Sequence, residues 1–192
     1  MKFLLIASFP DSLITFRGHL IDTLLARGMT VHVAAPNLLP ETGIYKSLDK
    51  KGVNIHNIPL RRTGINPFKD MFLLYFLCRL MLIIRPQMLL SYTIKPVIYG
   101  SLAARIMKVP YRYALITGLG YAFTGKVHGF RKFLSVIIRQ LYRLSLYGVD
   151  NVFFQNEDDQ KLFNDLGILS SKKQSVVING SGVDVVTFSQ AP

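Results

Sequence analysis

Residues 3–36 have the sequence FLLIASFPDSLITFRGHLIDTLLARGMTVHVAAP, and this stretch decides the fold class. It begins with the apolar run 3–7, which has no polar face and is therefore typical of a strand buried in a parallel sheet. A polar loop and an amphipathic helix over 16–27 follow, and Gly28 ends the helix before a second strand at 30–35. A strand, a helix and a strand in this order predict one unit of an open α/β sheet.

The same alternation continues along the chain. Strand-like apolar runs are expected at 3–7, 30–35, 53–58, 87–92, 111–116, 151–155 and 175–179. Helical patterns lie between them at 16–27, 41–51, 68–84, 96–107, 130–147 and 157–166. We therefore predict an α/β fold with a doubly wound, Rossmann-like parallel sheet of about seven strands and helices on both faces.

Open sheets of this kind bind ligands outside the carboxyl ends of their strands, so the loop after the first strand should border a site. That loop lacks the Gly-x-Gly-x-x-Gly pattern of a dinucleotide site, and no P-loop, zinc motif or nucleophile elbow is present. The four histidines show no metal-ligand spacing. We expect no cofactor and no metal, which leaves a flavin- or nucleotide-binding protein as a disfavoured alternative.

The charge of the chain is uneven. Residues 61–147 hold fourteen Lys or Arg and one acid, Asp70, so this block carries +13 against +12 for the whole chain. A basic block interleaved with aromatic and aliphatic residues fits an anionic membrane surface or a phosphate-bearing substrate. Nucleic acid is not expected as a partner, because no nucleic-acid-binding motif accompanies the charge. The single cysteine, Cys78, favours a reducing compartment and therefore a cytoplasmic protein.

The predicted helix over 130–147 separates an apolar face from a basic back. The apolar side chains expected to pack on the sheet are Phe130, Phe133, Leu134, Ile137, Leu141 and Leu144. The basic back is either solvated or in contact with anionic lipid headgroups, and one helix can do both. The membrane or phosphate contacts are then expected from Lys126, Arg131, Lys132, Arg139 and Arg143.

Two further side chains stand near predicted helix starts. Lys95 precedes Pro96, a residue suited to a first helical turn, and is either a phosphate contact or solvated. His19 lies where the positive end of a helix disfavours protonation, and it is either a polar contact or base in a crevice or a surface histidine.

Five segments resemble retaining glycosyltransferases of family four, which have the two-domain GT-B fold. The segments are 12–20 (SLITFRGHL), 91–96 (SYTIKP), 117–123 (TGLGYAF), 154–158 (FQNED) and 176–184 (VVINGSGVD). The last is similar to the segment in which the family passes from its N-terminal to its C-terminal Rossmann-like domain. The similarity is greatest to the bacterial subgroup that adds a sugar to an undecaprenyl-diphosphate-linked acceptor.

The resemblance implies that residues 1–178 form the acceptor-side domain, and that 179–192 form a linker and the start of a donor-binding domain absent from this chain. Sugar transfer would retain the anomeric configuration and need no metal. The acceptor would be a lipid-linked glycan, and a nucleotide-sugar would bind only with the C-terminal domain. The half alone is expected to be inactive, cytoplasmic and peripheral on the inner face of the cell membrane. The alternative is a non-catalytic membrane-docking module, or a subunit that pairs with a separate donor-binding domain.

The resemblance also implies an acceptor crevice formed by loops 8–19, 91–96 and 117–126. Its expected substrate contacts are Phe16, Arg17, Gly18, His19, Tyr92, Thr93, Lys95, Thr117, Gly118, Gly120 and Tyr121. The interdomain hinge is expected at Asn179, Gly180, Gly182 and Asp184. No catalytic residue is assigned to this half. Many family members carry a histidine after the fifth strand, where this chain has Thr117 and Gly118.

Overall fold

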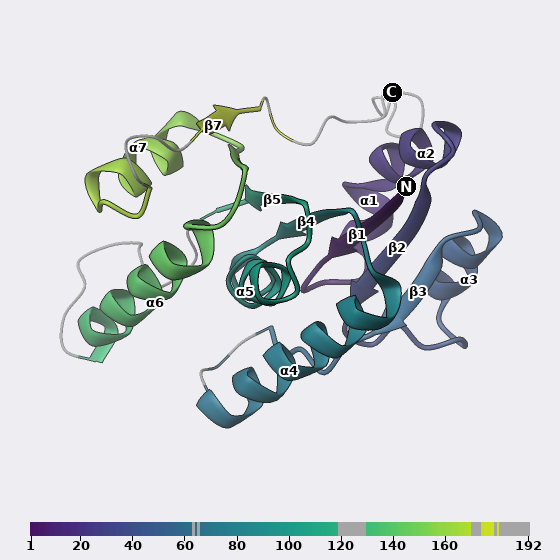
Figure 1. Ribbon diagram of the computed structural model, residues 1–192, viewed down its shortest axis with the longest axis horizontal. Coiled ribbons are helices and arrows are strands. Elements are labelled where there is room, and N and C mark those ends of the chain that lie inside the picture. Colours follow the sequence, from purple (N-terminus) through teal and green to yellow (C-terminus); the bar gives the residue numbers. More distant parts are fainter. Residues whose placement is uncertain (63, 65, 119–129, 170–173, 179, 181–192) are drawn as a thin grey trace, which may run out of the picture.

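The computed structural model describes residues 1–62, 64, 66–118, 130–169, 174–178 and 180, and it contains a seven-stranded sheet (Figure 1). The strands are β1 (Lys2–Ile6), β2 (Thr30–Ala35), β3 (Asn54–Asn57), β4 (Met88–Tyr92), β5 (Tyr111–Ile116), β6 (Asn151–Phe154) and β7 (Gln174–Val177). Their order is β3-β2-β1-β4-β5-β6-β7, and every neighbouring pair is parallel. The predicted fold class is confirmed.

Helices cover both faces of the sheet (Figure 1). They are α1 (Ser12–Thr15), α2 (Gly18–Ala26), α3 (Gly43–Lys50), α4 (Pro67–Ile84), the π-helical turn η1 (Pro96–Gly100), α5 (Ser101–Ile106), α6 (Phe130–Leu146) and α7 (Glu157–Asp165). The predicted helix over 16–27 is wrong at its start, because α1 precedes it and the backbone leaves the helical region at Arg17 (φ −124°, ψ 2°). The predicted helix over 96–107 also begins with a π-helical turn, a local widening that is frequent at functional sites.

Successive residues of each central strand point to opposite faces of the sheet. On β1, Leu5 packs with residues of α1, α2 and α3, whereas Ile6 packs with residues of α4 and α5. A third cluster joins β5 and β6 to η1, α6 and α7. In that cluster the Phe163 ring meets the rings of Tyr142 and Phe154 edge to face, with centroids 5.1 and 5.3 Å away. The sheet therefore has a core on each side.

Short-range signals mark where the helices begin and end. Gly28 follows α2 with a φ of +72°, a conformation that costs glycine little. Asn156 caps α7, where its side-chain oxygen accepts a hydrogen bond of 2.7 Å from the Asp159 backbone N–H. Asn66 caps α4 in the same way, with Pro67 at the first helical position.

Gly100 is a point of close approach between η1 and the sheet. A Cβ at this position would lie 2.5 Å from Ser91 Oγ and 3.2 Å from Ile6 Cδ1, and both neighbours are fully buried. We expect Gly100→Ala to lower the free energy of unfolding by about 1–3 kcal/mol, as overpacking substitutions do. Urea denaturation measures this change. Gly43→Ala is the matched control, because a Cβ at Gly43 meets nothing within 4 Å. Equal stability of the two variants would contradict the prediction.

Candidate functional site

The topology places the loops after β1 and β4 beside each other. From β1 the chain proceeds to β2 and β3 on one side, and β4 to β7 follow on the other. The two strands at such a reversal send their loops in opposite directions, which opens a crevice at the carboxyl edge of the sheet. The segments after β1 and after β4 therefore lie side by side at this edge of the sheet. That loops 8–19 and 91–96 form an acceptor crevice stays a prediction.

A cluster of hydroxyl groups joins these two loops. The Thr93 hydroxyl donates to Ser8 Oγ over 2.7 Å, and Ser12 Oγ lies 2.7 Å from the Tyr92 hydroxyl. Since Ser12 Oγ donates its one hydrogen to the Phe9 carbonyl, Tyr92 is the donor in the second pair. The cluster holds the loops after β1 and β4 together.

The Tyr92 side chain is buried, and burial raises the pKa of its phenol to about 12. This effect outweighs the nearby charge of Arg17, which lowers the pKa. Tyr92 is therefore protonated at neutral pH. It can orient a neighbouring group by hydrogen bonding, but it is not a base there.

Arg17 provides a buried positive charge beside Tyr92. Its side chain is turned inward and the residue is only 6% exposed, with the guanidinium carbon 5.1 Å from the centre of the Tyr92 ring. One terminal nitrogen donates to the Phe16 carbonyl over 3.1 Å, and Nε has no partner within the described part of the chain. Burial lowers the pKa of the guanidinium, although Tyr92 opposes this. A buried guanidinium with donors to spare is suited to an anionic ligand.

Thr93 has a strained backbone at the end of β4. Its φ is +70°, which is an outlier for a β-branched residue. The hydrogen bond to Ser8 holds it in place. Such strain gathers at functional sites, where the surrounding structure determines the conformation. The sequence identifies Thr93 as a crevice residue but carries no sign of this strain.

Lys95 does not extend freely into the crevice. Its ammonium lies 2.6 Å from Asp70 Oδ1 of α4, and both side chains are largely buried. Asp70 also accepts a hydrogen bond from Tyr99, and burial together with Asp70 raises the pKa of that phenol well above its usual range. The lysine expected either to meet a phosphate or to be solvated thus joins α4 to the turn after β4.

The other predicted crevice residues are less enclosed. Phe16 is exposed at the end of α1, Gly18 begins α2, and His19 is exposed in the first turn of α2. Thr117 and Gly118 follow β5, and Gly118 has a φ of +142°. Gly120 and Tyr121 lie outside the described residues.

The basic helix α6 packs differently from the prediction. Leu144, expected on the apolar face, is 54% exposed, whereas Tyr142 and Leu146 are buried in the core. The apolar residues of α6 cover more than one stripe, so their spacing alone does not determine which face is buried. Arg139 is half-buried, which departs from a solvated back, and its Nε has no partner in the described region. Arg143 is exposed.

The remaining predicted contacts are described in part. Arg131 and Lys132 belong to α6, but their side chains lie outside the described residues, as does all of Lys126. Of the predicted hinge, Gly180 is described and has a φ of +67°. Asn179, Gly182 and Asp184 lie outside the described part.

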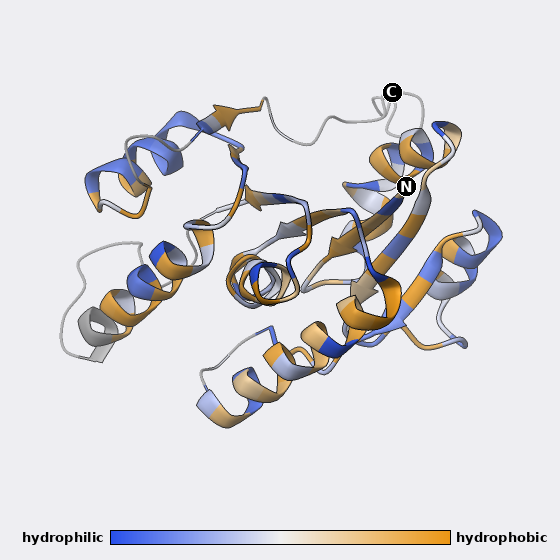
Figure 2. Cartoon of the chain, viewed as in Figure 1, coloured by the Kyte–Doolittle hydropathy of each residue, from blue (hydrophilic) through white to orange (hydrophobic). Residues whose placement is uncertain are grey.

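One surface that sequence analysis missed is the outer face of α4. It consists of Phe68, Met71, Phe72, Tyr75, Leu82 and Ile83, each more than half exposed. Figure 2 shows hydrophobic colouring along this helix. The signal was available in the sequence, since a helix that is apolar all round must either be enclosed or expose apolar side chains. Within the described chain, no helix is long and apolar enough to cross a membrane. No group of three metal-ligating side chains occurs there either.

Comparison with known proteins gives one family. The model of the family described as "Glycosyl transferase 4-like" matches residues 4–156. A relative in Campylobacter jejuni is 27% identical over 178 residues, which are 92% of this chain and 45% of that protein. That relative is named N,N'-diacetylbacillosaminyl-diphospho-undecaprenol alpha-1,3-N-acetylgalactosaminyltransferase.

Solved structures agree on the fold. A glycosyltransferase from Rickettsia africae has a TM-score of 0.62 at 19% identity, covering 100% of this chain and 46% of its own. The HepE protein of Anabaena in complex with UDP has a TM-score of 0.62 at 14% identity, and the match covers 100% of this chain and 47% of HepE. MurG of Acinetobacter baumannii has a TM-score of 0.58 at 17% identity, and the match covers 96% of this chain and 46% of MurG. The chain thus spans about half the length of the proteins it matches.

Proposed function

Because this chain belongs to the glycosyl transferase 4-like family, we propose that it is the acceptor-binding half of a two-domain GT-B glycosyltransferase. The enzyme moves a sugar from a nucleotide-sugar to a lipid-linked diphosphate glycan during the synthesis of cell-surface glycans. The observation that carries the proposal is the buried guanidinium of Arg17, which lies where the loops after β1 and β4 meet and whose Nε has no partner among the described residues. The name of the Campylobacter relative, which contains both a diphospho-undecaprenol acceptor and a sugar transfer, supports the substrate class.

The domain boundary is part of the proposal. Residues 1–178 form the acceptor-side domain, and 179–192 lead into a donor-binding domain. The nucleotide-sugar binds mainly to that second domain, and closure of the two domains excludes water from the reacting sugar. The match to 45% of the Campylobacter relative supports a division into halves.

The crevice residues have distinct roles in this proposal. Arg17 attracts the anionic part of the acceptor, and the Tyr92 hydroxyl is kept neutral by burial and acts as a hydrogen-bonding group. The Ser8–Thr93 pair sets the position of the loop after β4 relative to the loop after β1. None of these groups is placed as the reacting nucleophile, which belongs to the acceptor sugar.

Membrane association is proposed at the inner face of the cell membrane. The basic block of 61–147 and the apolar outer face of α4 together support it, because peripheral attachment needs both buried apolar area and attraction to anionic lipid. Arg143 of α6 is an exposed cation of this block.

Mixing this chain with a matching C-terminal half tests the function directly. We expect sugar transfer to a lipid-linked acceptor from the mixture only. Arg17→Gln should lower kcat/KM by about 10- to 100-fold, since a hydrogen bond to a charged group contributes about 1.5–3 kcal/mol. Arg17→Lys should recover part of the loss. Arg27→Gln, an exposed cation at the end of α2, is the control and should act as the unsubstituted chain.

Two results would overturn the proposal. Unchanged sugar transfer by the Arg17→Gln variant would show that Arg17 does not bind the acceptor. Lipid binding without transfer in any mixture would favour the alternative, a non-catalytic docking module, which the exposed face of α4 also fits.

A further inference from the structure

Two arginine side chains meet at the turn between α6 and β6. This turn lies at the amino ends of β5 and β6, which is the edge of the sheet opposite to the loops after β1 and β4. A Cβ at Gly148, in the turn, would lie 3.0 Å from Arg105 Cδ and 3.4 Å from a terminal nitrogen of Arg112. Arg105 belongs to α5 and Arg112 to β5. The absence of a side chain at Gly148 therefore lets cations from two elements reach one point.

These two guanidinium groups have hydrogen-bond donors to spare. Nε of Arg112 is enclosed and has no partner among the described residues. Within that part of the chain neither guanidinium makes an ion pair or a hydrogen bond. Arg105 instead lies over the Tyr147 ring, with its guanidinium carbon 5.0 Å from the ring centre. Because Tyr147 is 76% exposed, a ligand can approach this pair from solvent.

The neighbouring acid, Asp150, does not neutralise this pair. Its Oδ2 accepts the backbone N–H of Arg112 over 2.7 Å, and it makes no ion pair with either arginine in the described structure. Lys108, which follows α5, and Arg143, one turn before Tyr147, are further exposed cations. Against these four cations stand Asp150 and the carboxyl ends of α5 and α6, each of which contributes about half a negative charge. An excess of about two positive charges therefore remains at this edge.

We propose that Arg105 and Arg112 form a binding site for a phosphate monoester, with the phosphoryl group in front of Gly148. Guanidinium groups match phosphate because their planar donors can bind two oxygens at once. A phosphate monoester carries a charge of about −1.5 to −2 at neutral pH, which matches the excess of positive charge. The site is separate from the predicted acceptor contacts and independent of the proposed function.

Titration of the nitrogen-15-labelled chain with glycerol 3-phosphate, followed by NMR spectroscopy, tests the proposal. The ionic strength is held constant with NaCl, so that screening of surface charges does not change during the titration. We expect saturable shifts of the Gly148 amide signal and of the Arg112 Nε–H signal. Arg112→Gln should weaken binding by about 10-fold or more, because it removes a charge-assisted hydrogen bond.

Gly148→Ala tests the geometry of the site without changing its charge. The new methyl group would occupy the point at which the two arginines meet and would push their side chains apart. We expect a loss of affinity comparable with that of Arg112→Gln. The atoms displaced belong to flexible side chains, so the variant should keep the urea midpoint of the parent chain. Gly43→Ala is the matched control and should bind as the parent does, because a Cβ there meets nothing within 4 Å.

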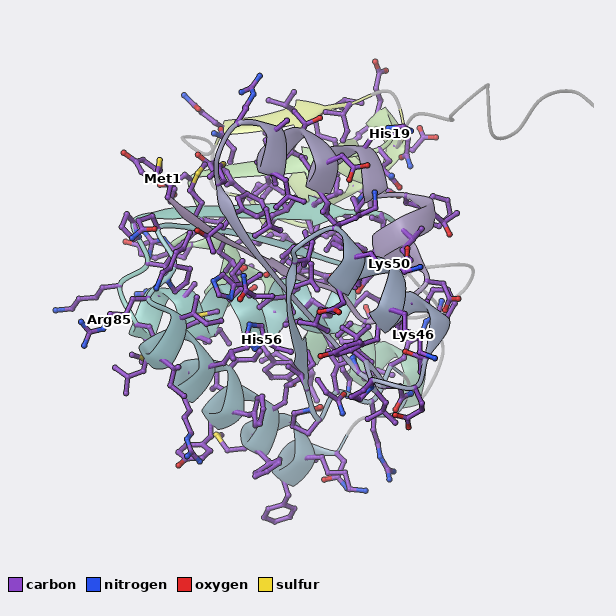
Figure 3. The ribbon with its side chains drawn as sticks, turned by 90° about the vertical axis from the view of Figure 1, so that its right-hand side faces the viewer. Met1, His19, Lys46, Lys50, His56 and Arg85 are labelled. Atoms are coloured by element: carbon purple, nitrogen blue, oxygen red, sulfur yellow. The ribbon has the colours of Figure 1, made fainter. Side chains whose placement is uncertain are left out.

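A second control removes the same amount of charge elsewhere. Arg105→Gln combined with Arg112→Gln should abolish the saturable shifts. Arg27 at the end of α2 and Lys50 on α3, which is labelled in Figure 3, are both exposed. The double variant Arg27→Gln with Lys50→Gln should bind glycerol 3-phosphate as tightly as the parent chain. An equal loss in this control would show non-specific charge attraction and overturn the proposal.

The phosphate monoester can come from a soluble metabolite or from the headgroup of phosphatidic acid, and vesicles distinguish the two sources. Binding of glycerol 3-phosphate without added affinity for phosphatidic acid vesicles assigns the site to soluble esters. Tighter binding to these vesicles that Gly148→Ala removes assigns it to the lipid headgroup. Shifts that never saturate, or saturable binding that neither Gly148→Ala nor Arg112→Gln weakens, would overturn the proposal.

Discussion

Replacing Asp70 by Ala is expected to lower the free energy of unfolding by about 3–5 kcal/mol. Asp70 Oδ1 lies 2.6 Å from the Lys95 ammonium, with the two side chains only 8% and 13% exposed. Removing the carboxylate leaves a buried ammonium without its counter-ion, and Tyr99 loses its acceptor. The cost is large because an unpaired charge in the interior is poorly solvated. Urea denaturation at neutral pH measures it.

Two further variants test the cause. Asp70→Leu combined with Lys95→Met removes both charges and should recover more than half of the loss, since apolar replacements of a buried pair are often neutral. Asp22→Ala breaks the exposed pair with Lys51, which is also 2.6 Å long, and should cost less than about 1 kcal/mol. If Asp70→Ala cost no more than Asp22→Ala, burial of the pair would not be the source of its contribution.

Acidification is expected to destabilise the protein through two histidines on neighbouring strands. His32 Nδ1 of β2 lies 3.0 Å from His56 Nε2 of β3, and the two rings stack. His56 is labelled in Figure 3. Burial, then His56 and Lys2, lower the pKa of His32 to about 4, and burial lowers the pKa of His56 as well. His32 is only 8% exposed.

The direction of the pH effect follows from these lowered values. Between pH 6.5 and about 4 the unfolded chain binds a proton at His32 that the folded chain does not, so stability falls as the pH falls through this window. The loss due to His32 should approach roughly 3 kcal/mol near pH 4, at 1.36 kcal/mol for each pKa unit, with no loss above about pH 7. Urea midpoints measured at pH 7.5, 6.5, 5.5 and 4.5 give the slope.

The control separates this pair from the carboxylates, which also titrate at low pH. His32→Leu combined with His56→Leu should flatten the dependence between pH 6.5 and 5, where few carboxylates change charge. A steep slope in the double leucine variant would assign the pH effect to other groups.

The sequence by itself determined the fold class, because the alternation of buried strands and helices is a local pattern. The uninterrupted apolar run of β1 and the glycine after α2 both follow from backbone physics and appear in the structure as predicted. The same pattern also predicts which loops meet, since the carboxyl ends of parallel strands share one edge. Family membership rested likewise on short segments in order, and the family model confirms it.

The tertiary structure alone decided what each polar or exposed side chain does. Lys95 pairs with Asp70, 25 residues away, and Arg17 turns inward to Tyr92. Neither contact can be predicted from spacing, because the partners come from different elements whose distance depends on packing. The sequence did not determine which face of α6 is buried or which face of α4 is exposed. The reason is the same in both cases, since each helix has more apolar residues than one neighbour can cover. The chemistry of the site therefore depends on how the helices pack against the sheet.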